Sequence, residues 1–292
     1  MNIVSESHNN HQIRLGKVAI DEIYNENANN VANRTDTNPI QYQTGARVLT
    51  GPTKIHIVYY GNLTTAQMNI VNTFIATIGN TAWFNIEKSY YYQATSISSK
   101  VYTTGPLTLG SITTDHYSYG TQLSDSSIPN IIYNHIRSGQ LQNDPHGIYL
   151  LLSAADVKEG YTSTSSFCTT YCGYHSAFSI GSTTYIYGFI GNPQNCMSTC
   201  SVWNRVVSPN GDTGVDAMLS PIAHEIVEAM SDPLLNAWLD SKGDENADKC
   251  AWTYGTTYRL GNGAYYNIAA NGKYYLIQQN WNANRQTCAM SV

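Results

Sequence analysis

The spacing of apolar residues predicts two helices in the first half of the chain. Thr64 or Thr65 can cap the start of the first helix, and Gly79 ends it. Its apolar residues recur at the three- and four-residue intervals of one helix face, and they are Met68, Val71, Phe74, Ile75 and Ile78. The second helix begins near Ser127 and ends near Gly139. Its apolar residues are Ile131, Ile132, Tyr133 and Ile136.

Short runs of β-branched, aromatic and other apolar residues predict strands. The run at 147–153 is apolar almost throughout, so we expect a buried central strand there. Residues 176–180 and 184–190 are separated by a glycine-serine pair and predict a hairpin or two paired edge strands. Further strands are predicted at residues 53–60 and within residues 88–104. Helices on a mixed sheet make the expected fold class α+β.

A third helix, predicted at about residues 216–231, carries polar and acidic residues along one side. Asp216 or Ser220 can cap its start, and Pro221 is expected within the first turn, where no backbone hydrogen bond is lost. Pro233 ends the helix, because the residue before a proline is disfavoured in the α region. The apolar side consists of Leu219, Ile222, Ala223, Ile226, Ala229 and Met230. The opposite side gathers His224, Glu225, Glu228, Ser231 and Asp232.

Composition divides the chain into an arm and one domain. Residues 1–50 are polar and rich in asparagine, and we expect a flexible arm or a pro-like segment that can mask a cleft. Residues 51–292 are expected to form a single domain, long enough for a full hydrophobic core. Within it, residues 51–232 are the predicted upper lobe, and the turn-rich residues 233–292 are the predicted C-terminal lobe.

The low charge of the chain favours a secreted protein. Charged residues make up 12%, against roughly a quarter in a typical soluble protein. The net charge of -5 argues against a nucleic-acid partner, which requires clustered lysine and arginine. No apolar run approaches the roughly 20 residues that span a bilayer, so we expect no membrane partner. Because the first residues do not resemble a secretory leader, we expect that the leader was removed or that export is unconventional.

Six cysteines predict three disulfides, because an even number in a chain of low charge is typical of secreted proteins. Cys168 and Cys172 are four residues apart, as are Cys196 and Cys200, and each pair suits a local bridge. Cys250 and Cys288 are then expected to join parts of the C-terminal lobe. The competing interpretation is a zinc site with four cysteine ligands from the two close pairs.

The segment from His224 to Glu228 has the pattern HExxE, a variant of the zincin motif HExxH. Residues four apart lie on the same helix face, so His224 and Glu228 can bind one metal ion together. Glu225 lies about 100° further round the helix, where its carboxylate can reach a water activated by the metal. Between Arg205 and Lys242 there is no lysine or arginine to balance the acidic residues. This imbalance favours a bound cation, although a solvated helix face gives the same periodicity.

A zinc hydrolase usually has three protein ligands and one open position, so a third ligand is expected downstream. Glu245 and Asp248 follow Glu228 by 17 and 20 residues, and either can supply it, although the side chain of Glu245 reaches further. Asp232 is a weaker candidate that fits capping of the helix end better. His175, just after a cysteine pair, can stabilise an oxyanion or can be a hydrogen-bonded structural histidine.

Several further segments follow one another in a specific order. They are Val58-Tyr-Tyr-Gly61, Phe167-Cys168, Cys172-Gly173-Tyr174-His175, Gly188 to Asn192, Cys196-x-x-x-Cys200, Pro209 to Met218, Ala223 to Glu228, Asp232 to Trp238, Glu245 to Cys250 and Gln278-x-x-Trp281. Over roughly residues 53–292 the chain resembles the EXORDIUM/phosphate-induced-protein family, secreted growth-associated proteins best known from plants. The resemblance implies an extracellular or cell-wall location and bridged cysteines. The arm at residues 1–50 departs from the family's usual secretory leader.

Together these features predict a secreted, zincin-like, zinc-dependent metallopeptidase that acts on a peptide or protein. Zn²⁺ is expected to lower the pKa of a bound water, and Glu225 to take its proton as general base and pass it to the leaving amine. A carboxylate at position 228 in place of histidine also suits Ca²⁺ or Mn²⁺. The alternative is a non-catalytic extracellular member of the family that uses calcium or zinc for stability and binds cell-wall glycan or a protein. A glycosidase with paired carboxylates fits this spacing less well.

Overall fold

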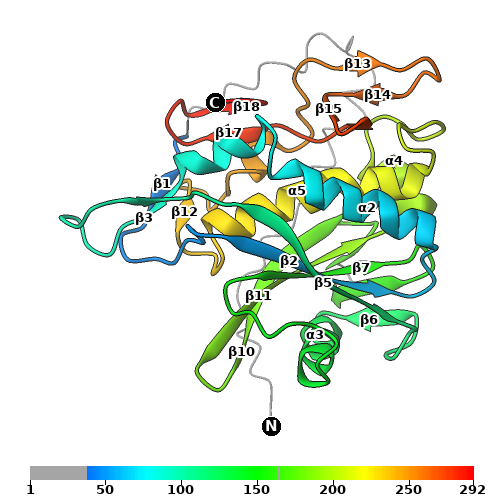
Figure 1. The fold of residues 1–292 in the computed structure, drawn as a ribbon, viewed down its shortest axis with the longest axis horizontal. Coiled ribbons are helices and arrows are strands. Elements are labelled where there is room, and N and C mark those ends of the chain that lie inside the picture. Colours follow the sequence, from blue (N-terminus) through cyan, green and yellow to red (C-terminus); the bar gives the residue numbers. More distant parts are fainter. Residues whose placement is uncertain (1–37, 163–164) are drawn as a thin grey trace.

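A five-stranded sheet forms the centre of the computed structural model, which describes residues 38–162 and 165–292. The strand order is β10 (Gly173–Ile180), β11 (Thr183–Gly191), β7 (Ile148–Ser153), β2 (Thr53–Tyr60) and β5 (Leu107–Asp115). Only the pair at one edge, β10 and β11, is antiparallel, and the other three pairs are parallel. The sheet is therefore mixed, and together with the helices it confirms the α+β class (Figure 1).

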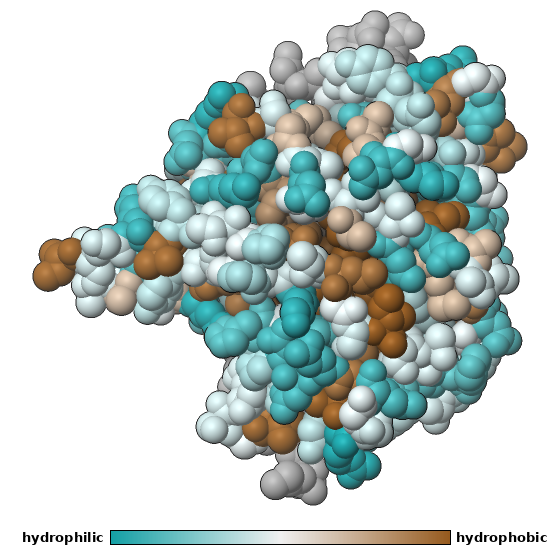
Figure 2. All heavy atoms as spheres, in the orientation of Figure 1, coloured by the Kyte–Doolittle hydropathy of each residue, from teal (hydrophilic) through white to brown (hydrophobic). Residues whose placement is uncertain are grey.

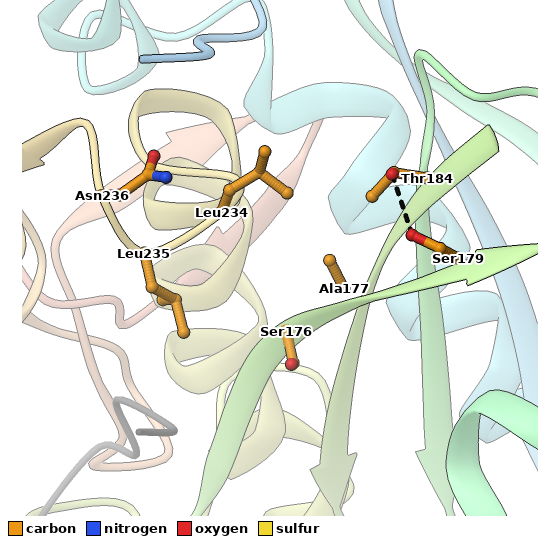
Figure 3. Close-up of a pocket in the computed structure, with 7 residues that line it drawn as sticks. All are labelled: Ser176, Ala177, Ser179, Thr184, Leu234, Leu235 and Asn236. Carbon is orange, nitrogen blue, oxygen red and sulfur yellow. Dashed lines mark hydrogen bonds between the residues drawn. The ribbon is translucent and has the colours of Figure 1, made fainter. Parts of the chain in front are cut away.

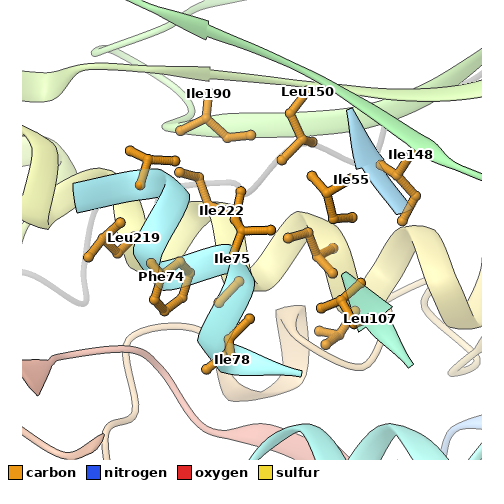
Figure 4. Close-up of a cluster of buried hydrophobic side chains, with 14 of the residues drawn as sticks. Ile55, Phe74, Ile75, Ile78, Leu107, Ile148, Leu150, Ile190, Leu219 and Ile222 are labelled. Atoms are coloured by element: carbon orange, nitrogen blue, oxygen red, sulfur yellow. The ribbon is translucent and has the colours of Figure 1, made fainter. Parts of the chain in front are cut away.

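Helices cover both faces of this sheet (Figure 1). One face carries α2 (Thr65–Ile78) and α5 (Thr213–Ser231), and the other carries α3 (Ser127–Arg137). Side chains that alternate along the strands enter two separate cores, as the pleat of a strand requires. The core under α2 and α5 includes Ile55, Phe74, Ile75, Ile78, Leu107, Ile148, Leu150, Ile190, Leu219 and Ile222 (Figure 4). The core under α3 includes Val58, Tyr60, Ile128, Ile131, Ile132, Tyr149 and Leu151.

The two helices predicted in the first half of the chain are both present. Thr64 caps α2 in a capping box, in which its side chain accepts from the backbone of Gln67 and the Gln67 side chain accepts from the backbone of Thr64. The second helix, α3, ends at Arg137, close to the predicted stop. Both helices were predictable because their caps and apolar periodicity are local.

The predicted start of α5 was wrong. The helix begins at Thr213, is 19 residues long and contains Pro221 in its interior. Asp212 caps it, with its carboxylate accepting from Val215 N at 2.9 Å and from Gln67 Nε2 of α2 at 2.9 Å. This cap and the burial of nearly every residue of α5 outweigh the interior proline, which costs about 3 kcal/mol in an isolated helix. His224 therefore lies in the middle of a long helix, and only the predicted end, at Ser231, was correct.

Residues 38–50 belong to the fold, although they were expected to be part of a flexible arm. Strand β1 (Gln41–Tyr42) pairs with β12 (Trp238–Leu239), and Leu49 N donates to Met230 O at 2.8 Å. Residues 1–37 lie outside the described residues. The segment 233–292, the predicted C-terminal lobe of the single domain, packs against the rest of it, because Tyr275 and Ile277 enter the same core as α5.

The remaining elements are short. The strands are β3 (Tyr91–Tyr92), β4 (Val101–Tyr102), β6 (Gln122–Ser124), β8 (Lys158–Thr162), β9 (Ser165–Ser166), β13 (Tyr258–Arg259), β14 (Tyr265–Tyr266), β15 (Ile268–Ala270), β16 (Lys273–Tyr275), β17 (Asn280–Asn282) and β18 (Thr287–Ala289). The short helices are η1 (Phe84–Ser89), η2 (Pro193–Asn195), α4 (Met197–Cys200) and η3 (Asp248–Cys250). The β3–β4 hairpin projects from the body (Figure 1). Ile97 and Val101 of this hairpin are exposed, and apolar residues are visible on its surface (Figure 2). Among the helices of the described ranges, none combines the length and apolarity needed to cross a membrane.

Three disulfides are present, but two of them do not join the predicted partners. Cys168 bonds to Cys196 and Cys172 bonds to Cys200, each across 28 residues. Residues 168–172 form a turn, with Cys168 at a positive φ of 72°, rather than the helical turn assumed for a local bridge. The segment around α4 lies beside this turn, so each cysteine meets its counterpart. All four sulfurs are bonded, which excludes the four-cysteine zinc site, whereas the predicted bridge between Cys250 and Cys288 is confirmed.

Candidate metal centre

Three separate parts of the chain bring the predicted site residues together. Helix α5 supplies His224, Glu225 and Glu228, and strand β10 supplies His175. The segment before and within η3 supplies the other two predicted ligands, Glu245 and Asp248. All of these side chains are almost completely buried except that of Asp248, which is 16% exposed. Asp248 N donates to Glu228 Oε1 at 3.0 Å, so the backbone of η3 contacts the polar side of α5 directly.

The ring of His224 is held by Gln278. Gln278 Nε2 donates to Ala247 O at 2.8 Å, so its amide oxygen must face the ring, where it lies 3.0 Å from Nδ1. Nδ1 therefore carries a proton and donates it, which directs Nε2 toward the acidic residues. Nε2 lies 2.9 Å from Glu228 Oε1 and 3.5 Å from Asp248 Oδ1. Neither contact has the geometry of a hydrogen bond to Nε2 within the described chain.

His175 is held in a similar way on the opposite side of Glu228. Its Nε2 lies 3.3 Å from the backbone carbonyl oxygen of Asp232, which can only accept a hydrogen bond. Its Nδ1 lies 3.3 Å from Glu225 Oε2 and 3.6 Å from Glu228 Oε2. Nε2 also lies 3.6 Å from Glu245 Oε1. The sequence predicted His175 near the site as an oxyanion donor or a structural histidine, and the structure places it among the predicted ligands.

Glu225 points from α5 toward the antiparallel edge of the sheet. A Cβ atom added at Gly173 of β10 would lie 3.3 Å from Glu225 Oε1 and 2.9 Å from Phe189 O. The absence of a side chain at residue 173 therefore leaves the space that the Glu225 carboxylate occupies. The close contact fixes Glu225 between β10 and α5, next to His175.

Burial and charge shift the protonation of the centre strongly. Burial raises the pKa of Glu225 to about 7, although a hydrogen bond with His175 opposes the increase. Burial alone would also raise the pKa of Glu228, but the charges of His224 and His175 lower it to about 2. Burial would lower the pKa of His175, but hydrogen bonds with Glu225 and Glu228 raise it to about 10. Burial and neighbouring carboxylates raise the pKa of Glu245 well above its ordinary value.

Negative charge exceeds positive charge in this buried region. Five carboxylates, those of Glu225, Glu228, Asp232, Glu245 and Asp248, surround two imidazoles. The nearby cation Lys249 already forms an ion pair with Asp240 at 3.0 Å. Burying several carboxylates without enough counter-charge costs several kcal/mol per ion, so the region requires protons or a bound cation.

The donor atoms fit a divalent cation. Ligand atoms about 2.1 Å from a tetrahedral ion are separated by about 3.4 Å, and the two contacts of His224 Nε2 measure 2.9 and 3.5 Å. Both carboxylate oxygens of Glu245 are buried and form no hydrogen bond with any described residue. One imidazole with carboxylates suits zinc or manganese better than calcium, which takes oxygen ligands. These residues therefore fit the predicted metal.

The donors divide into two groups rather than one. His224, Glu228 and Asp248 form one group, and His175, Glu228 and Glu245 form the other, with the donor atoms of each group within 4.8 Å of one another. The sequence left open whether Glu245 or Asp248 is the third ligand, and the structure places one in each group. Asp232 accepts from the backbone nitrogens of residues 236 and 237 at 2.6 and 2.7 Å, as expected for a residue that ends a helix.

The supporting residues were not predicted. Gln278 orients His224, but no spacing rule connects it to α5. Glu87 of η1 is completely buried, and burial raises its pKa well above the ordinary value. It accepts from Asn246 Nδ2 and from Asn280 Nδ2, each at 3.2 Å. Asn246 and Gln278 do occur in segments that resemble the family, which was the only signal in the sequence.

A pocket lies beside the centre, between the edge strand β10 and the loop after α5 (Figure 3). Its lining residues are Ser176, Ala177, Ser179, Thr184, Leu234, Leu235 and Asn236. Ala177 is two residues after His175, so both side chains lie on the same face of β10. The pocket therefore continues along the strand from the centre.

Comparison with known proteins places the chain in a family. The family model described as the phosphate-induced protein 1 conserved region matches residues 40–291. Protein EXORDIUM-like 3 of Arabidopsis thaliana is 34% identical over 280 residues, covering 83% of this chain and 80% of that protein. Protein PHOSPHATE-INDUCED 1 of Nicotiana tabacum is 26% identical over 294 residues, covering 87% of this chain and 88% of that protein. No solved structure matches the chain. The chain therefore belongs to the phosphate-induced protein 1 family, which includes the EXORDIUM-like proteins.

Proposed function

We propose that this protein is an extracellular, metal-dependent hydrolase of peptide bonds. His224, Glu228 and Asp248 hold a divalent cation, with zinc preferred, and Glu225 is the general base. The observation that carries the proposal is the orientation of His224, whose Nδ1 faces Gln278 and whose Nε2 faces two carboxylates. A histidine that binds metal commonly donates its other N–H to a second acceptor in this way.

Glu225 has the properties of a general base. A divalent cation in such a site supplies Lewis-acid activation of water and of the scissile carbonyl. Burial raises the pKa of Glu225, which favours uptake of a proton by its carboxylate. Its Oε1 forms no hydrogen bond with a described residue, and its Oε2 contacts His175. His175 thus lies beside the base, and its role in stabilising an oxyanion stays a prediction.

The edge of the sheet offers a place for an extended peptide. Strand β10 is the last strand of the sheet and is paired only with β11 among the described strands. An added peptide strand can form backbone hydrogen bonds along such an edge, with its side chains entering neighbouring pockets. The pocket between β10 and Leu234 is lined in part by Ala177 (Figure 3), whose side chain lies on the same face of β10 as that of His175.

The second candidate function is a non-catalytic extracellular protein in which the metal is structural. The burial of the donors favours it, since the side chains of His224 and Glu228 are at most 2% exposed and a structural metal site is closed to substrate. Surface tyrosines such as Tyr258, 55% exposed, then bind cell-wall glycan or a protein partner. Three disulfides are consistent with an extracellular location for either candidate.

Metal content and one substitution test the proposal. Plasma mass spectrometry on protein purified without chelator should find bound zinc, and cleavage of a fluorogenic peptide library should depend on it. His224→Ala should remove the metal and the activity, whereas Glu225→Gln should keep the metal and lose the activity. Glu159→Gln is the matched control, because Glu159 is also buried but hydrogen-bonded by Tyr171 and Tyr174 instead. Zinc without cleavage of any peptide would favour the second candidate, and no metal would contradict both.

A further inference from the structure

We propose that the centre binds two divalent cations, with Glu228 as a carboxylate bridge between them. This inference rests on the proposed metal-binding function and adds a second ion to it. The first ion is held by His224, Glu228 and Asp248, and the second by His175, Glu228 and Glu245.

The two oxygens of Glu228 point to different histidines. Oε1 lies 2.9 Å from His224 Nε2, and Oε2 lies 3.6 Å from His175 Nδ1. A site for a single ion needs only one of the two carboxylate oxygens of Glu228. A carboxylate between two imidazoles on opposite sides is the arrangement of a bridging ligand, and bridged ions in hydrolases lie about 3.5–4 Å apart.

In both histidines, one ring nitrogen contacts a carbonyl oxygen that does not belong to a proposed ligand. His224 directs one ring nitrogen at an amide oxygen, that of Gln278, at 3.0 Å. His175 directs one ring nitrogen at a backbone carbonyl, that of Asp232, at 3.3 Å. The other nitrogen lies 2.9 Å from Glu228 Oε1 in His224 and 3.6 Å from Glu228 Oε2 in His175, where it also lies 3.3 Å from Glu225 Oε2. Such an outer hydrogen bond fixes the tautomer of a metal-binding histidine. His175 is therefore assigned as a metal ligand, as His224 is.

Glu245 supplies an independent argument for the second ion. Its side chain is completely buried, and neither carboxylate oxygen forms a hydrogen bond with a described residue. Its Oε1 lies 3.6 Å from Nε2 of His175, the nitrogen that also contacts Asp232 O. A buried carboxylate without hydrogen bonds is costly unless a cation approaches it. Two divalent ions bring four positive charges to the five carboxylates of the centre, whereas with one ion the charge of Glu245 must be neutralised by a proton.

Metal stoichiometry on the full chain tests this inference. The protein is stripped with chelator, dialysed against buffered Zn²⁺, and analysed for zinc per chain by plasma mass spectrometry. We expect two ions per chain at saturation. Reloading with Mn²⁺ should give the exchange-coupled electron paramagnetic resonance spectrum of a bridged pair, which a single bound ion cannot give.

Substitutions assign the ions to the two groups. His175→Ala should lower the stoichiometry from two to one and remove the coupled spectrum, and Glu228→Gln should weaken both ions. His56→Ala is the matched control, because His56 is equally buried beside a carboxylate, 3.3 Å from Asp144, and should keep two ions. The wild-type measurement needs no variant to fold. One ion in the wild-type chain, with an uncoupled manganese spectrum, overturns the inference but leaves the proposed function intact, whereas no ion overturns both.

Discussion

Replacing Gln278 with leucine should weaken metal binding, although Gln278 is not itself a proposed metal ligand. The substitution removes the acceptor 3.0 Å from His224 Nδ1 and the donor 2.8 Å from Ala247 O. The first loss frees the ring of His224 to rotate and to change tautomer. The second loss releases the residue just before Asp248. Loss of an outer partner of this kind lowers metal affinity by about 10- to 100-fold, which is about 1.4–2.7 kcal/mol of binding free energy.

The assay measures zinc affinity by competition with a chromophoric chelator at pH 7, on stripped protein. The unfolding free energy of the metal-free variant is measured separately, because an unpaired Ala247 carbonyl costs about 1–3 kcal/mol by itself. Gln278→Glu keeps an acceptor for His224 and should lose less affinity than Gln278→Leu. Gln279→Leu is the matched control, because the neighbouring glutamine is only half-buried and should leave zinc affinity unchanged. A folded Gln278→Leu protein with wild-type zinc affinity would refute the role assigned to His224.

Three further predictions concern stability and the disulfides. Burial raises the pKa of Glu159 from 4.5 to about 7, so the folded state holds its proton more tightly and stability should fall by about 3 kcal/mol as the pH rises through that interval. Glu159→Gln should remove most of this slope in guanidinium unfolding at pH 5 and pH 8, and an unchanged slope would contradict the shift. Ile222→Ala, in the core under α5, should lower the unfolding free energy by about 2–5 kcal/mol, whereas Ile97→Ala, 95% exposed, should change it by less than about 0.5 kcal/mol. Opening the Cys250–Cys288 bridge with serines removes a 38-residue constraint worth about 4 kcal/mol and should also weaken zinc binding, because η3 carries Asp248. Opening Cys168–Cys196 should not change zinc affinity, and equal losses from both bridges would show that the effect is not local to η3.

Local sequence signals predicted the helices better than the contacts between them. The capping residue of α2 and its apolar spacing lie within one short segment, so the helix could be identified directly. The start of α5 could not, because a rule about Pro221 in isolation ignores the Asp212 cap and the burial of the whole helix. The disulfide partners were missed for a similar reason, since Cys168 and Cys196 meet only when two distant segments pack together.

The residues of the candidate site likewise divide into those related by local sequence spacing and those brought together only by packing. His224, Glu225 and Glu228 are related by helical spacing, which the sequence displays. Glu245 and Asp248 were found by their distance from the motif, but their assignment to two groups depends on the path of the chain around η3. The position of His175 depends on the pairing of β10 with β11 and on the packing of α5 against this edge of the sheet. Sequence spacing contains no information about that packing.

The arrangement of the centre also determines which experiment can identify an enzyme. Its donors come from β10, α5 and the segment 245–248, so a bound cation joins the edge of the sheet to the C-terminal part of the chain. Any ion bound only by the folded state stabilises it, by about 4 kcal/mol at a thousand times its dissociation constant. Removing the metal must therefore loosen these three parts whether the ion is structural or catalytic. Loss of activity on chelation does not distinguish the two roles, but Glu225→Gln does, because it leaves every proposed ligand in place and removes only the base.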